Sequence, residues 1–163
     1  KYNCHSFKTA FLYGDLEEEI FMECPPGLEG VTDDNALMLY QCIYGLVQSV
    51  RQYHKKIFKI LKIIGFEGSD VDPCLMMRHD EKGLIYMAVY VDDNFFVGTE
   101  EAIWDTIAHL KSKGLILKEY DTLNDYLSCK IKFSDNGHSA CLGQPHLISN
   151  LEKKFEKYMK ILE

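Results

Sequence analysis

Several features that define whole classes of protein are missing from this chain of 163 residues. No apolar run approaches the ~20 residues that a membrane-spanning helix needs, so no membrane partner is expected. Repeats, low-complexity tracts and a signal-peptide pattern after Lys1 are absent as well. An excess of basic residues is also missing, since the net charge is −7, which is a poor footprint for a nucleic-acid binder. The whole chain is 47% hydrophobic and 26% charged, which is the composition of a globular protein, and its length is that of one domain.

The cysteines lack the pattern of a metal or disulfide framework, because none of the six forms a C-x-x-C pair. They are Cys4, Cys24, Cys42, Cys74, Cys129 and Cys141. Their scattered positions, mostly in apolar segments, predict reduced and buried thiols in an intracellular protein, cytoplasmic or nuclear. His138, Cys141 and His146 resemble a metal motif, but no fourth ligand accompanies them and a structural zinc site uses four.

Strand-like and helix-like segments alternate irregularly, which predicts an α+β fold. Strands are expected at residues 1–7, 19–23, 37–43, 74–77, 84–89, 95–98, 115–118, 126–133 and 140–142, the last after a turn at 135–137. A turn or short helix is expected at 9–16, and helices at 49–64, 99–113 and from 145 onward. Ser49 and Thr99 are expected to cap the first two helices, and Leu147, Leu151 and Phe155 to face inward from the third.

The expected helix 49–64 carries two stripes. The apolar one comprises Val50, Tyr53, Ile57, Ile60, Leu61 and Ile64. The basic one comprises Arg51, Lys55, Lys59 and Lys62, whose spacing places them on the other side of the helix. A solvated surface is the ordinary explanation of such a basic stripe, and binding to nucleic-acid phosphates is the functional one.

Tyr90-Val91-Asp92-Asp93 is the most informative segment. It separates two apolar runs, which predicts a β-hairpin with the carboxylates at its tip. Asp is an ordinary turn former, so a solvated turn is one interpretation. The other is a cation site, because Mg²⁺ is commonly held by one or two carboxylates plus substrate phosphates.

Four groups of residues together resemble one family, the reverse transcriptases of copia-type LTR retrotransposons. They are Lys8 to Ile20; Tyr44-Gly45-Leu46 with Gln48 and Arg51; Gly65-Phe66 with Asp72-Pro73-Cys74-Leu75; and Tyr90 to Asp93. The resemblance runs from about residue 5 to the end. It implies a polymerase palm over residues 1–163, an antiparallel sheet backed by helices, with the Tyr90–Asp93 hairpin at its centre. It also implies RNA-templated DNA synthesis with Mg²⁺, and a template-primer and deoxynucleotides as partners.

The resemblance assigns roles to individual positions. Asp92 and Asp93 match the paired catalytic and metal-binding carboxylates. Phe11 matches the aromatic residue that excludes a nucleotide bearing a 2′-hydroxyl, and Gln48 and Arg51 match the segment that positions the template and the incoming nucleotide. Tyr126 and Leu127 begin the segment that grips the primer end. With Lys55, Lys59 and Lys62, these two are expected to contact nucleic acid.

The departures from the family pattern concern catalysis directly. Ser6 stands where the family has its third carboxylate, an Asp that bridges both metal ions, and a neutral hydroxyl is a weak Mg²⁺ ligand. Val47, Val50 and Tyr53 replace the usual Lys, Pro and Trp. The fingers region expected upstream and the RNase H expected downstream are not within these residues, nor is an integrase.

Two hypotheses follow. The first is the reverse transcriptase domain of a decayed copia-type element, inactive as written because of Ser6. The second is a non-catalytic module that reuses the palm fold to bind protein or nucleic acid, which the net acidity and Ser6 favour.

Overall fold

The computed structural model describes residues 1–30, 32, 35–119, 125–134 and 139–159. Its chain divides into two compact units, Lys1–Tyr120 and Asp121–Glu163. Each unit is a mixture of helix and antiparallel strand, which agrees with the α+β class expected from the sequence. No helix in the described part of the chain is both long and apolar enough to cross a membrane.

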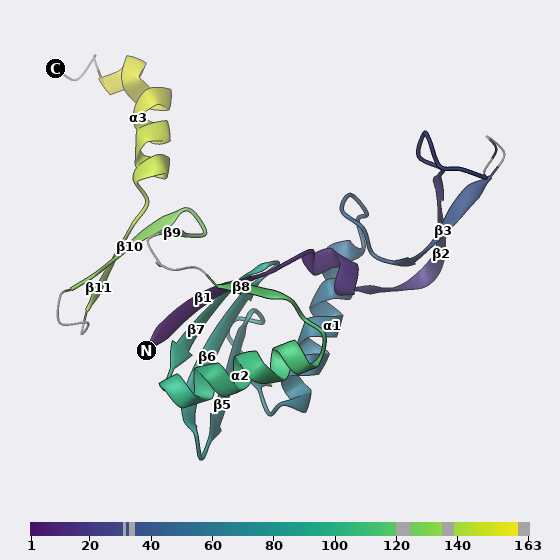
Figure 1. Cartoon of the computed structure of the whole chain (residues 1–163). Coiled ribbons are helices and arrows are strands. Elements are labelled where there is room, and N and C mark those ends of the chain that lie inside the picture. Colours follow the sequence, from purple (N-terminus) through teal and green to yellow (C-terminus); the bar gives the residue numbers. More distant parts are fainter. Residues whose placement is uncertain (31, 33–34, 120–124, 135–138, 160–163) are drawn as a thin grey trace. The chain divides into compact units, whose positions relative to one another are not determined.

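A six-stranded antiparallel sheet forms the centre of the first unit (Figure 1), in the order β4-β5-β6-β7-β1-β8. Its strands are β1 (Tyr2–Phe7), β4 (Glu67–Gly68), β5 (Leu75–Asp80), β6 (Gly83–Tyr90), β7 (Asp93–Gly98) and β8 (Leu117–Glu119). β5 and β6 form one hairpin, in which Asp80 pairs with Gly83. The next hairpin joins β6 to β7, and β1 adds to β7 from the other end of the unit's sequence.

Two helices cover one face of this sheet, α1 (Ser49–Ile63) and α2 (Glu100–Ser112). Alternate strand residues point to opposite faces, and the inward set is fully buried, including Phe7, Ile85, Met87 and Phe96. These side chains pack with a buried set from the helices, which comprises Tyr53, Ile57, Ile60, Leu61, Ile103, Ile107 and Leu110. Burying each large apolar side chain contributes about 1.5–3 kcal/mol, so this single core accounts for the stability of the unit.

The other face of the sheet is not covered by a described helix of this unit. A cross-strand row of apolar side chains runs over it: Tyr2 opposite Val97, Val97 opposite Tyr86, and Tyr86 opposite Met77. Each of these four is 38–45% exposed. Ser6 and Asp93 lie on this same face, because they are in phase with Tyr2 and Val97 along their strands.

Helix α1 differs from expectation at its start. Ser49 is the first helical residue rather than the cap, and Gln48 stands at the cap position, where its side chain forms no capping hydrogen bond within the described residues. The Ser49 hydroxyl instead donates back to the carbonyl of Ile43 at 2.6 Å. Val50 is 52% exposed, so the apolar stripe begins at Tyr53. The helix ends as predicted near Gly65, which has a φ of +90° that favours glycine.

Helix α2 is capped as predicted. The Thr99 side chain accepts from the backbone N–H of Ala102 at 3.4 Å and donates to the carbonyl of Lys82 at 2.6 Å. Glu100 and Glu101 occupy the first turn, where they interact favourably with the helix dipole. One hydroxyl therefore both begins the helix and ties it to the β5–β6 turn.

Replacing Thr99 with alanine is expected to lower the free energy of unfolding by about 1 kcal/mol, the usual cost of a lost cap. Urea denaturation measures the change. Thr99→Ser keeps the hydroxyl and should lose less than half as much. Equal losses in the two variants would show that the Thr99 methyl group, and not the cap, carries the effect.

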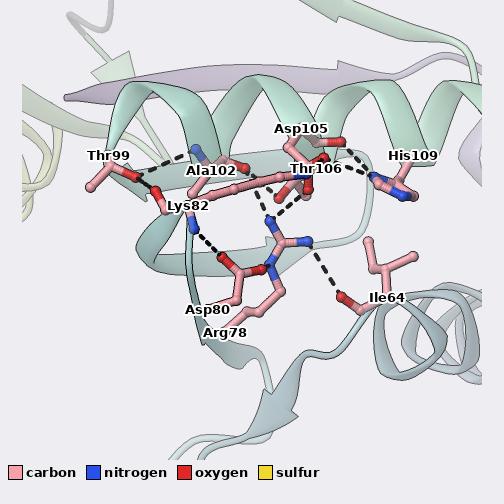
Figure 2. A network of polar contacts seen from close by, with 9 residues as sticks. All are labelled: Ile64, Arg78, Asp80, Lys82, Thr99, Ala102, Asp105, Thr106 and His109. Atoms are coloured by element: carbon pink, nitrogen blue, oxygen red, sulfur yellow. Dashed lines mark hydrogen bonds and ion pairs between the residues drawn. The ribbon is translucent and has the colours of Figure 1, made fainter.

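A buried arginine joins β5 to both helices (Figure 2). Arg78 is 5% exposed and its guanidinium donates to Asp105 Oδ2 at 2.9 Å and to the Ile64 carbonyl at 3.3 Å. Asp80 lies 3.1 Å from Arg78 Nε, and Lys82 pairs with the second oxygen of Asp105. The Lys82 hydrogen bond, followed by that of Arg78, holds the pKa of Asp105 below its ordinary value.

The strands β2 (Asp15–Glu23) and β3 (Ala36–Gln41) form a separate two-stranded sheet in the first unit. β2 begins four residues earlier than residue 19, where the strand was expected. The short 3₁₀ helix η1 (Ala10–Tyr13) precedes it. Salt bridges connect β2 to α1, from Lys55 to Glu17 at 2.8 Å and from Lys56 to Asp15 at 2.6 Å.

The second unit contains β9 (Asp125–Tyr126), β10 (Cys129–Phe133), β11 (Ala140–Gly143) and α3 (Pro145–Met159). The strand expected at 126–133 is therefore divided, because Leu127 and Ser128 adopt φ values of +50° and +65°. The prediction that three side chains of α3 face inward is wrong within the described residues, since Leu147, Leu151 and Phe155 are 45–51% exposed. The turn expected at 135–137 lies outside the described residues.

The cysteines agree with expectation in part. All six are free thiols, but only Cys4 and Cys42 are buried, and Cys141 is exposed. Burial, with a smaller effect of Asp93, raises the pKa of Cys4 to about 11. His138 lies outside the described residues. Among the residues that the structure does describe, no three His, Cys, Asp or Glu side chains are grouped so that they could hold a metal ion.

Candidate functional site

The residues Tyr90 to Asp93 join β6 to β7. Tyr90 pairs with Asp93 across the hairpin, which leaves Val91 and Asp92 as the turn. Val91 has a φ of +51°, a conformation that costs a β-branched residue on the order of 1–3 kcal/mol. Two hydrogen bonds hold the turn in place. The backbone carbonyl of Asp92 accepts both, one from the Phe7 backbone N–H at 2.8 Å and one from Asn94 Nδ2 at 2.9 Å.

Ser6 lies beside this turn. It pairs directly with Asp93 in the β1–β7 register, and directly with Lys118 in the β1–β8 register. Side chains that are directly opposite on antiparallel strands share a face, with Cβ atoms about 4.5–5.5 Å apart. Ser6 is therefore the immediate neighbour of Asp93, and Lys118 lies on its other side.

The environment of Asp93 disfavours its charged form. Burial, and then the adjacent charge of Asp92, raise the pKa of Asp93 above its ordinary value. Neither carboxylate forms an ion pair with a Lys or Arg among the described residues. A half-buried carboxylate pair without a cation is an arrangement that a bound divalent ion would stabilise, and its hard oxygen donors suit Mg²⁺.

Phe11 lies in an aromatic cluster next to β1. Its ring centroid is 4.7 Å from that of Tyr44 and 6.2 Å from that of Tyr53, and Tyr53 in turn packs edge-on against Phe7. Gly14 permits this close packing, since a Cβ there would lie 3.0 Å from the backbone nitrogen of Tyr53. Phe11 is thus connected to the carboxylate turn through Tyr53 and through Phe7, whose N–H holds Asp92.

The polar residues that the sequence singled out on α1 and just before it are at least partly exposed, and some of them contact acidic residues of β2. Gln48 Nε2 lies 3.4 Å from Glu18 Oε1 of strand β2, and Arg51 is exposed. Lys55, Lys59 and Lys62 are exposed as expected. Lys55 is nevertheless engaged with Glu17, and this contact lowers the pKa of Glu17. The basic stripe therefore has two lysines, Lys59 and Lys62, that form no ion pair within the described residues.

Tyr126 and Leu127 belong to the second unit, at the point where β9 gives way to the turn before β10. Leu127 is 42% exposed. Of the positions expected from the sequence, the structure brings together Ser6, Asp92 and Asp93. Phe11 is connected to them through Tyr53 and Phe7.

Two residues near the turn were not expected. Asn94 is completely buried and donates a hydrogen bond to the Asp92 carbonyl. Tyr53 is also buried, and its hydroxyl has no hydrogen-bond partner within the described part of the chain. Burial, with a further effect of Asp92, raises the pKa of Tyr53. The signal for Asn94 was present in the sequence, since an amide between Asp93 and an apolar strand is unusual in a buried segment.

Comparisons with known proteins agree with this arrangement of residues. The family described as "Reverse transcriptase (RNA-dependent DNA polymerase)" matches residues 3–159. Because the match covers nearly the whole chain, the chain belongs to the reverse transcriptase family. Its relatives place it among the copia-type transposons.

Three relatives illustrate the likeness. The chain is 34% identical over 153 residues to the "Retrovirus-related Pol polyprotein from transposon TNT 1-94" of Nicotiana tabacum, covering 91% of this chain and 11% of that polyprotein. It is 32% identical over 125 residues to the "Retrovirus-related Pol polyprotein from transposon RE2" of Arabidopsis thaliana, covering 76% and 9%. It is also 32% identical over 130 residues to the "Putative transposon Ty5-1 protein YCL074W" of Saccharomyces cerevisiae, covering 79% and 42%. The chain thus spans less than half of each of these curated relatives.

Proposed function

We propose that residues 1–163 derive from the palm of a copia-type reverse transcriptase, whose full polyprotein carries out RNA-templated DNA synthesis. The observation that supports this most directly is the pairing of Ser6 with Asp93 beside the Val91–Asp92 turn. The family resemblance expects its first and last carboxylates at these positions, which are 87 residues from one another in sequence and adjacent in the sheet. The comparisons do not favour the alternative of a non-catalytic module.

In this proposal Asp92 and Asp93 hold Mg²⁺. When bound in pairs, such ions stabilise both the attacking and the leaving oxygen of a phosphoryl transfer. Phe11 would contact the sugar of the incoming nucleotide, and Gln48 and Arg51 would contact the nucleotide and template. Tyr126 and Leu127 would contact the primer end.

The same geometry supports the proposal that the chain is impaired as written. Ser6 supplies a neutral hydroxyl at the position from which a carboxylate would bridge two ions. Asp92 lies in the turn and Asp93 is the first residue of β7, so both carboxylates come from the β6–β7 hairpin and neither comes from β1. The two therefore cannot supply the ligand that β1 lacks.

Primer extension tests the proposed function. The assay uses a fusion in which the region preceding the matched segment of the tobacco relative precedes this chain, with an RNA template and Mg²⁺. Extension by the Ser6→Asp fusion that is abolished by Asp92→Asn would support the proposal. A Ser6→Asp fusion that binds primer-template but shows no metal-dependent extension would contradict it.

The basic stripe of α1 provides a separate prediction. If Lys59 and Lys62 contact phosphates, replacing both with glutamine should reduce the slope of log affinity against log salt by about one unit per lysine. Fluorescence anisotropy with an RNA–DNA duplex at several salt concentrations measures this slope. The matched control is Lys111→Gln with Lys113→Gln, which removes the same charge from the C-terminal end of α2. If the two double variants change the slope equally, or neither changes it, the stripe is an ordinary solvated surface and does not bind phosphates.

A further inference from the structure

Asn94 is a buried polar residue for which the family resemblance provides no role. It occupies the second position of β7, directly after Asp93, and none of its surface is exposed. It points toward the helix-covered face of the sheet, opposite to Asp93. Its cross-strand neighbours are Val89 on β6 and His5 on β1.

The two ends of the Asn94 amide differ in their hydrogen bonds. Nδ2 donates to the Asp92 carbonyl at 2.9 Å, whereas Oδ1 is buried and has no hydrogen-bond partner among the residues that the structure describes. A buried acceptor without a partner destabilises a fold, and an apolar side chain of similar size would avoid this penalty. Packing alone therefore does not explain asparagine at this position, and the contact that remains to explain it is the one to Asp92.

That contact acts on a strained turn. Val91 has a φ of +51°, which a valine adopts only where the surroundings hold it. The Asp92 carbonyl is held by two donors, one from each side: the Phe7 N–H of β1 and the Asn94 amide of β7. Ser6 immediately precedes Phe7, so the same hydrogen bond ties the turn to the strand that carries position 6.

We propose that Asn94 is a positioning residue for the carboxylate turn: together with the Phe7 N–H it clamps the Asp92 carbonyl and so fixes the Asp92 and Asp93 side chains relative to position 6. The catalytic part of this proposal rests on the proposed function, but the clamp itself is a property of the fold. Asn94 is fully buried on the face of the sheet opposite to the Asp93 side chain, so in this proposal it acts through the backbone of Asp92.

Hydrogen exchange of the full chain tests the clamp. Asn94→Leu keeps the branched arrangement of side-chain heavy atoms and removes the donor, and it should speed exchange of the Phe7 amide about tenfold by loosening the acceptor of that amide. Amides in the β5–β6 hairpin should be unaffected. Phe96→Leu is the matched control, since Phe96 is a fully buried residue of the same strand and face whose side chain has no hydrogen-bond donor for the Asp92 carbonyl. Where the leucine at position 94 prevents folding, Asn94→Ser is used, because serine is too short to reach the carbonyl.

A double-mutant cycle distinguishes a clamp from general packing. Glycine adopts a positive φ without strain, so Val91→Gly reduces the need for the clamp. The effect of Asn94→Leu on Phe7 exchange should then fall to less than half of its value in the presence of Val91. If the effect is the same in both backgrounds, or is no larger than that of Phe96→Leu, the positioning role is wrong.

The catalytic consequence is measured in the Ser6→Asp fusion. Asn94→Leu should lower kcat about tenfold and leave KM for the deoxynucleotide within about twofold. The reason is that the nucleotide-binding surface is unchanged, whereas the two carboxylates are no longer held in position. Adding Val91→Gly should recover part of the loss. An unchanged kcat would overturn the catalytic part of the inference. A fusion that shows no extension even with Asn94 present would contradict the reverse transcriptase proposal, whereas the exchange experiment still decides the clamp.

Discussion

Replacing Ser6 with aspartate is expected to raise the rate of primer extension by about a hundred- to a thousandfold, measured in the fusion that supplies the upstream region. Electrostatic groups that stabilise a transition state typically contribute this much, and each ~1.36 kcal/mol corresponds to a factor of ten. The register explains why one substitution suffices: position 6 is directly opposite Asp93, so the new carboxylate enters the same face of the sheet.

The same substitution provides a readout without catalysis. A third carboxylate beside Asp92 and Asp93 adds repulsion, so the Ser6→Asp chain should melt at a lower temperature in the absence of metal. Millimolar Mg²⁺ should then raise its melting temperature more than that of the unaltered chain, because a ligand stabilises the state that binds it. Lys118, also opposite position 6, will compete for the new charge, and Lys118→Gln should enlarge the Mg²⁺ effect.

The outcome that would prove this interpretation wrong is specific. If the fusion with Ser6 extends a primer as fast as the Ser6→Asp fusion, and Asp92→Asn abolishes both activities, then the β1 carboxylate is not required. Ser6→Asn is the control for size, since asparagine has the shape of aspartate but no charge. It should leave primer extension at the level of the Ser6 protein.

Replacing Asp105 with alanine is expected to lower the free energy of unfolding by about 3 kcal/mol. Removing one member of a buried ion pair leaves its partner as an uncompensated charge, and such changes typically cost about 3–5 kcal/mol. Arg78 retains Asp80 at 3.1 Å, which places the expected loss at the lower end of that range. Urea denaturation at pH 7 measures it. Glu101→Ala, an exposed change on the same helix, should cost less than about 0.5 kcal/mol.

The effect of Asp105 should also depend on pH. Its pKa is lowered in the folded state by the hydrogen bonds from Lys82 and Arg78, so folding favours the ionised form. This stabilisation is present above the unfolded carboxyl pKa of about 3.9 and is lost as pH falls through the lower folded value. The difference in unfolding free energy between the unaltered chain and Asp105→Ala should therefore shrink below about pH 4. A difference that stays constant down to pH 2 would show that the contribution of Asp105 is not electrostatic.

Features that depend on residues close together in the sequence were predicted correctly more often than features that depend on distant ones. Helix α2 begins and ends where Thr99 and Gly114 indicated, because caps and apolar periodicity act within one or two turns. Ser49 failed as a cap because its hydroxyl bonds to Ile43, six residues earlier, a contact that helical spacing does not encode. The face of α3 was expected to be inward from periodicity alone, and within the described residues its apolar side chains remain exposed.

By itself the sequence determined the α+β class, the main helices and the identity of the motif residues, and the match to the reverse transcriptase family bears out the resemblance on which those motifs rested. Only the tertiary structure decided that Ser6 pairs with Asp93, that Arg78 is buried among acidic partners, and that Asn94 holds a turn strained at Val91. Strand pairing joins residues whose separation in the chain leaves no trace in local patterns. A buried hydrogen bond is recognisable only after the fold has excluded water from both of its partners.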